Sequence, residues 1–196
     1  NNQFNRATQA LRSPGSTFKI FPYLAALENG IKIDAKFIDR PKCWSNYCPK
    51  NFGNKYMGKV SMSDSFAKSL NTVAVELLDI VGFQKVINVA NRFGIGNKIK
   101  LGKYYPLAIG AYEQTLLDMT ATYAGIANRG IYFKPIPFEE IRDANNKILW
   151  KYNAPQRQGK KAINKNIADT MNLMLIKAVS IGTGKAGELP NRKVAG

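Results

Sequence analysis

The segment that most constrains the fold is residues 16–28 (STFKIFPYLAALE), whose apolar side chains nearly encircle a helix. A helix that is apolar all round is buried on all sides, and other layers of the domain must cover it. Ser16 can cap this helix, and Asn29-Gly30 can end it. The apolar positions are Phe18, Ile20, Phe21, Leu24, Ala25 and Leu27.

The rest of the chain reads as more helix than strand. Further helical patterns are predicted at residues 61–68, 71–80, 83–93, 116–127 and 167–179. Residues 131–152 alternate around a turn at residues 143–146, which predicts a β-hairpin. Residues 31–60 are punctuated by proline and glycine and predict a long loop-rich stretch. Because such apolar helices need a surface to pack on, we expect that part of a sheet is lacking.

Composition excludes several classes of catalysis. The chain contains no histidine, which removes Ser-His-Asp and Cys-His mechanisms and most zinc sites. A nucleophilic mechanism would need Lys, Asp, Glu or Tyr as its base. The net charge of +16 suggests an anionic neighbour, but the basic residues are dispersed, which favours a solvated surface.

Cys43 and Cys48 have four residues between them, in a loop rich in turn-forming residues. With no second cysteine pair and no histidine, a metal site is not favoured. A local disulfide and two free thiols both remain open. No stretch approaches the roughly 20 apolar residues of a membrane span. The chain opens at Asn1 without a secretory signal, and we expect it to be a piece of a longer protein.

Ser16-Thr17-Phe18-Lys19 is the strongest candidate for chemistry. On a helix, residues i and i+3 share a face, so the Ser16 hydroxyl and the Lys19 amine come within hydrogen-bond reach. The first turn also offers unpaired backbone N–H groups and a positive dipole end. Burial would lower the pKa of Lys19, and a neutral amine can take the serine proton. The alternative is an ordinary helix cap beside a lysine whose amine reaches solvent.

Ser-x-x-Lys occurs about once by chance at this composition, and Ser65 with Lys68 is a second match. Ser65 lies in a short polar segment that would leave Lys68 solvated, which favours Ser16 as the nucleophile. Ser69 and Asn71 form a Ser-x-Asn whose hydroxyl could relay a proton and whose amide could hold a peptide. Taken alone, that pair is explained better by a helix start.

A Lys-Thr/Ser-Gly motif is absent, and residues 185–187 (KAG) lack its hydroxyl and follow a loop. The order of the remaining motifs is a signature of penicillin-binding proteins and class A β-lactamases. The chain resembles the class A penicillin-binding proteins, the bifunctional glycosyltransferase–transpeptidases, over nearly its whole length. The segments that carry the resemblance are residues 4–10 (FNRATQA), 12–19 (RSPGSTFK), 23–30 (YLAALENG), 107–110 (LAIG), 115–120 (TLLDMT), 123–124 (YA) and 182–196.

The resemblance implies a mixed α/β serine β-lactamase/transpeptidase-like fold, predominantly helical here with a small β component. Ser16 would attack the D-Ala-D-Ala carbonyl of a peptidoglycan stem peptide, or a β-lactam ring, and form an acyl-enzyme. Lys19 would act as general base, Ser69 would pass a proton toward the leaving group, and Asn71 would hold the substrate backbone. The Ser16 N–H would supply half of the oxyanion hole.

The resemblance further implies that residues 1–196 are the central part of a transpeptidase domain, ending just before the Lys-Thr-Gly strand. The chain alone is then expected to acylate poorly, because losing one oxyanion donor costs on the order of a hundred- to thousandfold in rate. No cofactor or metal and no nucleic-acid partner is expected. The parent protein would carry a glycosyltransferase and a membrane anchor, and would work at the periplasmic face of the bacterial cell membrane.

Two rival functions stay open. A β-lactam sensor or β-lactamase would share the fold, although Glu76 and Glu113 do not stand in a clear motif position for a deacylating base. A non-enzymatic basic module could bind nucleic acid or an anionic membrane. It would explain the charge, but the chain shows no RNA-binding signature or recognition-helix pattern.

Overall fold

The computed structural model describes residues 3–152 and 158–196. The chain is mixed α/β with more helix than strand, as expected. The described part contains three two-stranded antiparallel sheets, of which the sequence predicts one. The helices are α1 (Ile20–Glu28), α2 (Met62–Ala67), α3 (Asn71–Val81), α4 (Phe83–Arg92), α5 (Leu116–Ala127) and α6 (Lys165–Ile181), with 3-10 turns η1 (Gly15–Lys19), η2 (Phe52–Asn54), η3 (Tyr105–Ile109) and η5 (Lys185–Gly187). The strands are β1 (Lys36–Asp39), β2 (Gly58–Ser61), β3 (Ile131–Tyr132), β4 (Glu140–Arg142), β5 (Ile148–Lys151) and β6 (Lys160–Lys161). None of the helices in these residues is both long and apolar enough to cross a bilayer.

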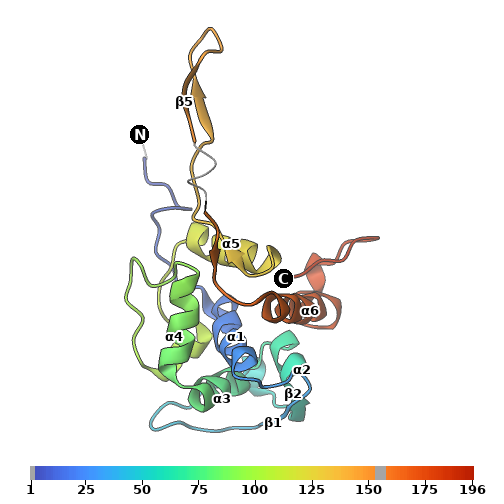
Figure 1. Ribbon diagram of the computed structural model, residues 1–196. Coiled ribbons are helices and arrows are strands. Elements are labelled where there is room, and N and C mark those ends of the chain that lie inside the picture. Colours follow the sequence, from blue (N-terminus) through green and yellow to red (C-terminus); the bar gives the residue numbers. More distant parts are fainter. Residues whose placement is uncertain (1–2, 153–157) are drawn as a thin grey trace.

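Helix α1 lies at the centre of the body, with α4 and α6 on either side of it and α3 below (Figure 1). The eight residues from Ile20 to Leu27 are all buried, and α3, α4 and α6 pack against them. The prediction of a centrally buried helix is therefore confirmed. The predicted end is also confirmed, because Asn29 caps the helix and Gly30 adopts a φ of 81°.

The start of this helix differs from the prediction. Ser16 is not the cap: a 3-10 turn begins at Gly15, after Pro14, and Ser16 lies inside it. The turn is tight because Gly15 takes a φ of 55°, and because the Thr17 hydroxyl donates to the Pro14 carbonyl. As a result Ser16 is exposed while Lys19, at the end of the turn, is buried.

Residues 31–60 contain strands that the sequence analysis missed. Strand β1 pairs antiparallel with β2 in the register Lys36↔Ser61. Both strands are only four residues long. One of the two buried positions of β1 is the acidic Asp39, so the sequence does not show the alternation of apolar and polar residues that predicts a strand. The short pair β3–β6 was missed for a similar reason, since each strand has two residues.

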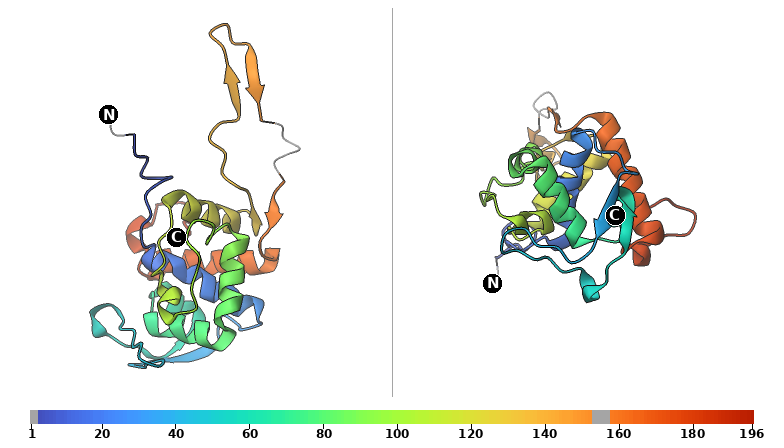
Figure 2. Two further views of the ribbon diagram at one scale, coloured as in Figure 1. Left: turned by 90° about the vertical axis from the view of Figure 1, so that its left-hand side faces the viewer. Right: turned by 90° about the horizontal axis from the view of Figure 1, so that it is seen from below.

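The predicted hairpin is confirmed as β4–β5, and it projects far from the helical body (Figures 1 and 2). Its turn is held by the Asp143 carboxylate, which accepts from the backbone N–H groups of Asn145 and Lys147. The predicted helices at residues 61–68, 71–80, 83–93, 116–127 and 167–179 are α2 to α6, with bounds within a few residues.

Cys43 and Cys48 form a disulfide, which resolves the alternative that the sequence left open. The loop that it closes also pairs the backbones of Trp44 and Tyr47 in both directions. Replacing both cysteines by serine should lower the free energy of unfolding by about 2 kcal/mol, because closing so short a loop removes little chain entropy. Urea unfolding with and without a thiol reductant measures this. An equal effect of the reductant on the wild type and the double variant would contradict it.

Candidate functional site

Lys19 connects the first candidate motif to the second. Its side chain is 2% exposed, and its Nζ donates to the Ser69 carbonyl oxygen at 2.6 Å and to the Ser69 Oγ at 2.9 Å. The two residues lie 50 positions apart in the sequence. The fold therefore brings the amine of the Ser-x-x-Lys and the hydroxyl of the Ser-x-Asn into direct contact.

Burial lowers the pKa of Lys19 to about 8. Within the described residues the amine has no ion pair, so no carboxylate offsets the cost of removing its charge from water. The lowered pKa raises the fraction of neutral amine near pH 7, and a neutral amine can accept a proton. The predicted effect of burial on this lysine is thus present in the structure.

Ser69 occupies a sharp turn between α2 and α3. Its φ of 54° is uncommon for a residue with a side chain, and the neighbouring amides fix the turn. The Ser69 N–H donates to the Phe66 carbonyl, and the Leu70 N–H donates to the Ser65 carbonyl. A backbone conformation of this kind persists only where the surrounding structure holds it in place, and such residues cluster at functional sites.

Asn71 is the first residue of α3 and is half-buried. Its Nδ2 donates to the Lys50 carbonyl at 2.7 Å, and its backbone N–H donates to the Asn51 Oδ1 at 2.8 Å. Within the described residues its Oδ1 and its second amide hydrogen make no hydrogen bond, so they are available to a ligand. Ser69 and Asn71 therefore belong to one turn, although each is held by a different element.

Ser16 is exposed and lies in the 3-10 turn that ends at Lys19. No hydrogen bond joins it to Lys19 in the described part of the chain, although catalytic hydrogen bonds often tighten only in the substrate complex. The turn that carries Ser16 is held from α5, where the Tyr123 hydroxyl donates to the Thr17 carbonyl at 3.0 Å. Burial raises the pKa of Tyr123 to about 12, which keeps that donor protonated.

The sequence analysis missed the close contact between this turn and the end of η3. The Ser13 hydroxyl donates to the Gly110 carbonyl at 2.6 Å. Gly110 has a φ of 82°, and a Cβ there would lie 2.2 Å from the Gly15 carbonyl oxygen. The glycine is required by a neighbour distant in the chain, and only its place in the LAIG segment drew attention to it.

The second Ser-x-x-Lys has a structural role. Ser65 is fully buried, although the segment around it is polar in sequence. Its Oγ forms hydrogen bonds with the Tyr23 hydroxyl at 2.9 Å and with the Met62 carbonyl. Lys68 is exposed, as predicted, and donates to the Ile181 carbonyl. Residues 185–187, which the sequence analysis rejected as a third motif, form the exposed turn η5 and not a strand.

The cluster can perform nucleophilic chemistry with a lysine base. It offers an exposed hydroxyl, a buried amine with a lowered pKa, a second hydroxyl bonded to that amine and an oriented carboxamide. In the described residues no group of three or more Cys, Asp or Glu side chains could hold a metal ion.

Comparison with known proteins identifies the family. Residues 1–196 match the family described as Transpeptidase, the penicillin binding protein transpeptidase domain. The chain is 39% identical over 175 residues to penicillin-binding protein 1A of Rickettsia prowazekii, covering 86% of this chain and 21% of that protein. It is 38% identical over 202 residues to penicillin-binding protein 1A of Aquifex aeolicus, covering 100% of this chain and 27% of that protein.

The fold is shared with solved structures of the same kind. An imipenem acyl-enzyme complex of penicillin-binding protein A from M. tuberculosis superposes with a TM-score of 0.85 and 22% identity, covering 98% of this chain and 49% of that chain. At that identity the likeness establishes the fold alone. The chain spans about a fifth to a quarter of the length of the two curated relatives. It belongs to the penicillin-binding protein transpeptidase domain family, as part of such a domain of the class A type.

Proposed function

We propose that the protein containing this chain is a serine D,D-transpeptidase that cross-links peptidoglycan. The observation that carries the proposal is the hydrogen bond from the buried Lys19 amine to Ser69, one turn after the exposed Ser16. Family membership supports the same reaction class. A glycosyltransferase, a membrane anchor and a periplasmic location are proposals about the rest of the protein, drawn from the class A resemblance.

The chemistry divides among four residues. Ser16 Oγ attacks the carbonyl carbon between the two D-alanines, and its proton passes to the neutral Lys19 amine. Ser69 passes its proton to the departing D-Ala amine as the C–N bond breaks and an ester forms on Ser16, and Ser69 regains a proton from the Lys19 ammonium bonded to it. Asn71 holds the peptide backbone of the substrate through its free amide groups. The amine of a second stem peptide then attacks the ester, loses a proton to Lys19, and the released Ser16 oxygen takes that proton from Lys19. A β-lactam ring opens by the same first step and leaves the acyl group attached.

The proposal is tested by locating the acyl group. The full-length protein is incubated with a fluorescent penicillin, digested, and its labelled peptide sequenced by mass spectrometry. The expected result is a single adduct on the peptide containing Ser16. An adduct on any other serine, or no adduct at all on folded protein, would overturn the proposal.

The acylation rate should rise with pH. Because burial lowers the pKa of Lys19 to about 8, the neutral base is scarce below that pH and predominates above it. The second-order rate constant should therefore rise nearly tenfold per unit between pH 6 and 7.5 and level off above about pH 8.5. Stopped-flow acylation across this range measures the midpoint. A flat profile would show that Lys19 is not the base.

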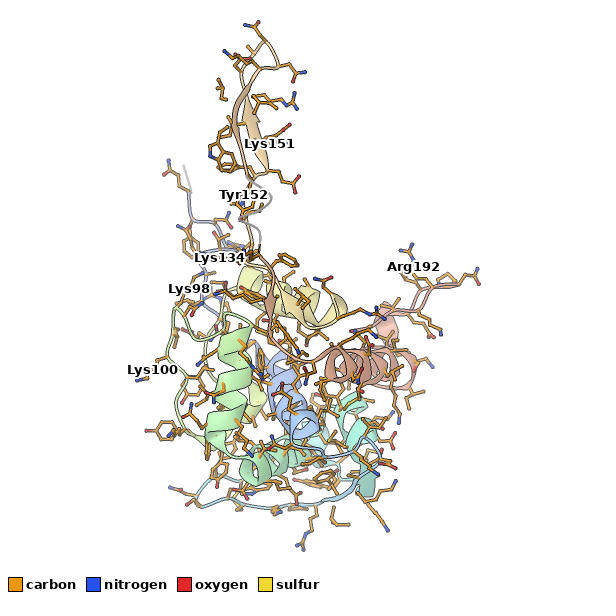
Figure 3. All side chains as sticks on the ribbon, viewed as in Figure 1. Lys98, Lys100, Lys134, Lys151, Tyr152 and Arg192 are labelled. Atoms are coloured by element: carbon orange, nitrogen blue, oxygen red, sulfur yellow. A yellow bond between two sulfur atoms is a disulfide. The ribbon has the colours of Figure 1, made fainter. Side chains whose placement is uncertain are left out.

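A basic module for nucleic acid is less well supported. Lys100, Lys151 and Arg192 project from separate parts of the chain, with Lys151 on the hairpin and Lys100 and Arg192 on opposite sides of the body (Figure 3). Dispersed cations make a poor track for a polyanion. Retention on DNA with a steep salt dependence would revive this alternative.

A β-lactamase is distinguished by the lifetime of the acyl-enzyme. Glu76 is joined to Lys42 by an ion pair of 3.0 Å, which does not favour a role as deacylating base. We expect release of the penicilloyl group over hours, as measured by the decay of label after a chase. Release within milliseconds would favour a β-lactamase.

A further inference from the structure

Beneath the Ser-x-Asn turn lies a buried polar network that the proposed reaction does not use. Asp39, at the end of β1, is 1% exposed, and Asn51, in the loop between β1 and β2, is 5% exposed. The Asn51 Nδ2 donates to the Asp39 Oδ1 at 2.8 Å and to the Lys55 carbonyl at 3.1 Å. The other Asp39 oxygen accepts from the Met57 N–H. A buried carboxylate bonded to several donors fixes the geometry around it.

The network ends at the first turn of α3. The Asn51 Oδ1 accepts from the backbone N–H groups of Asn71 at 2.8 Å and Thr72 at 3.4 Å, and the Thr72 hydroxyl donates to Asp39. These amides are among the four that a helix start leaves unpaired. Leu70, the residue before α3, makes no side-chain cap, so Asn51 supplies the cap from a distant loop.

Asp39 determines which way the Asn51 amide faces. Because a carboxylate only accepts hydrogen bonds, the Asn51 NH₂ must turn toward Asp39. Its oxygen is then directed at α3. The adjacent Lys50 carbonyl receives the Asn71 side chain at 2.7 Å. Both the backbone and the carboxamide of Asn71 are thus held by residues 50–51, whereas Ser69 is held by α2 and Lys19.

We propose that Asn51, oriented by Asp39, is a positioning residue for Asn71, and so controls how the site grips its peptide or β-lactam. This rests on the proposed function, in which Asn71 holds the substrate backbone. Removing the Asn51 side chain should break its hydrogen bonds to the first turn of α3 and increase the mobility of the Asn71 carboxamide. The Lys19–Ser69 hydrogen bond should remain in place. The effect should then fall on substrate binding and not on the base.

The test is made in the full-length protein with the variants Asn51→Ala and Asn46→Ala and a fluorescent penicillin. Asn51→Ala should lower the second-order acylation constant roughly 10- to 100-fold, since small misplacements near a site have effects of that size. The loss should come from weaker binding, and the pH midpoint of acylation should stay unchanged. Asn46→Ala is the matched control, because it makes the same substitution in the same loop at an exposed residue outside the network, and it should acylate at the wild-type rate.

A double-mutant cycle separates positioning from general destabilisation. If Asn51 acts through Asn71, then Asn51→Ala should cost little in an Asn71→Ala background. The inference would be overturned if the double variant showed the full product of the two single-variant losses in acylation rate. A shifted pH midpoint in Asn51→Ala, or acylation by Asn51→Ala at the wild-type rate, would also overturn it. In the folded variant, hydrogen exchange at the Asn71 and Thr72 amides should also accelerate.

Should Asn51→Ala fail to fold, Thr72→Val removes one donor to Asp39 with little change of shape and is tested in the same assay. A several-fold weakening of binding with an unchanged pH midpoint supports the inference, and wild-type binding overturns it. Failure of the proposed function looks different: the wild-type protein itself would lack a penicillin adduct on Ser16.

Discussion

Labelling by fluorescent penicillin should disappear when Ser16 is replaced by alanine. The exposed Ser16 hydroxyl is the proposed site of the new ester, and removing a nucleophile of this kind lowers turnover by on the order of a millionfold. The fold should be unaffected, because Ser16 makes no hydrogen bond to Lys19 and lies outside the core. Gel fluorescence after a long incubation, with circular dichroism for folding, measures both expectations.

The matched control is Ser65→Ala, which alters the other Ser-x-x-Lys. Ser65 is fully buried against Tyr23, so this variant should lose about 1 kcal/mol of stability from a broken hydrogen bond yet keep its label. Label that persists in Ser16→Ala and vanishes in Ser65→Ala would reverse the assignment of the two motifs.

Replacing Lys19 by methionine should lower the acylation constant roughly 10²- to 10⁴-fold, the range usual for the loss of a general base. Methionine fills much of the same buried space without an amine, so the core around Lys19 should remain packed. The rate that remains should no longer show a midpoint near pH 8, because the titrating group is gone. Stopped-flow measurements at several pH values separate this loss from misfolding.

Lys68→Met provides the comparison, since Lys68 is exposed and contacts only a backbone carbonyl in the described residues. It should acylate at the wild-type rate with the same pH dependence. If both lysine variants retained the pH midpoint, a titrating group other than Lys19 would have to be the base.

The sequence predicted the helices well because their apolar periodicity is strong. Residues 116–127 were predicted as a helix with the bounds that α5 has, and Asn29-Gly30 ended the central helix as expected. Strand β1 was missed because one of its buried positions is the acidic Asp39. The hydrogen bonds that allow this burial come from residues distant in the sequence, such as Asn51. Local pattern carries little information about pairing between strands as short as four residues.

The four candidate site residues stay a prediction, and the contacts among them follow from the fold and not from local pattern. Ser16, Lys19, Ser69 and Asn71 were all singled out from motif order. The observed partner of Lys19, however, is Ser69, because the 3-10 turn leaves Ser16 outside and buries the lysine. The residues next to Asn51 and Gly110 in the sequence do not predict their contacts, because Asn51 bonds to Asn71 and Gly110 packs against Gly15, each tens of residues away.

Lys19 is the residue before the buried helix α1, so the pKa of its amine depends on how well this part of the domain is packed. Lys19 is 2% exposed and its amine lies against Ser69, so its lowered pKa depends on how the η1 turn and the residues after α2 pack together. A substitution elsewhere on the exposed surface can then change what the site accepts while leaving the basicity of the proposed general base unaltered.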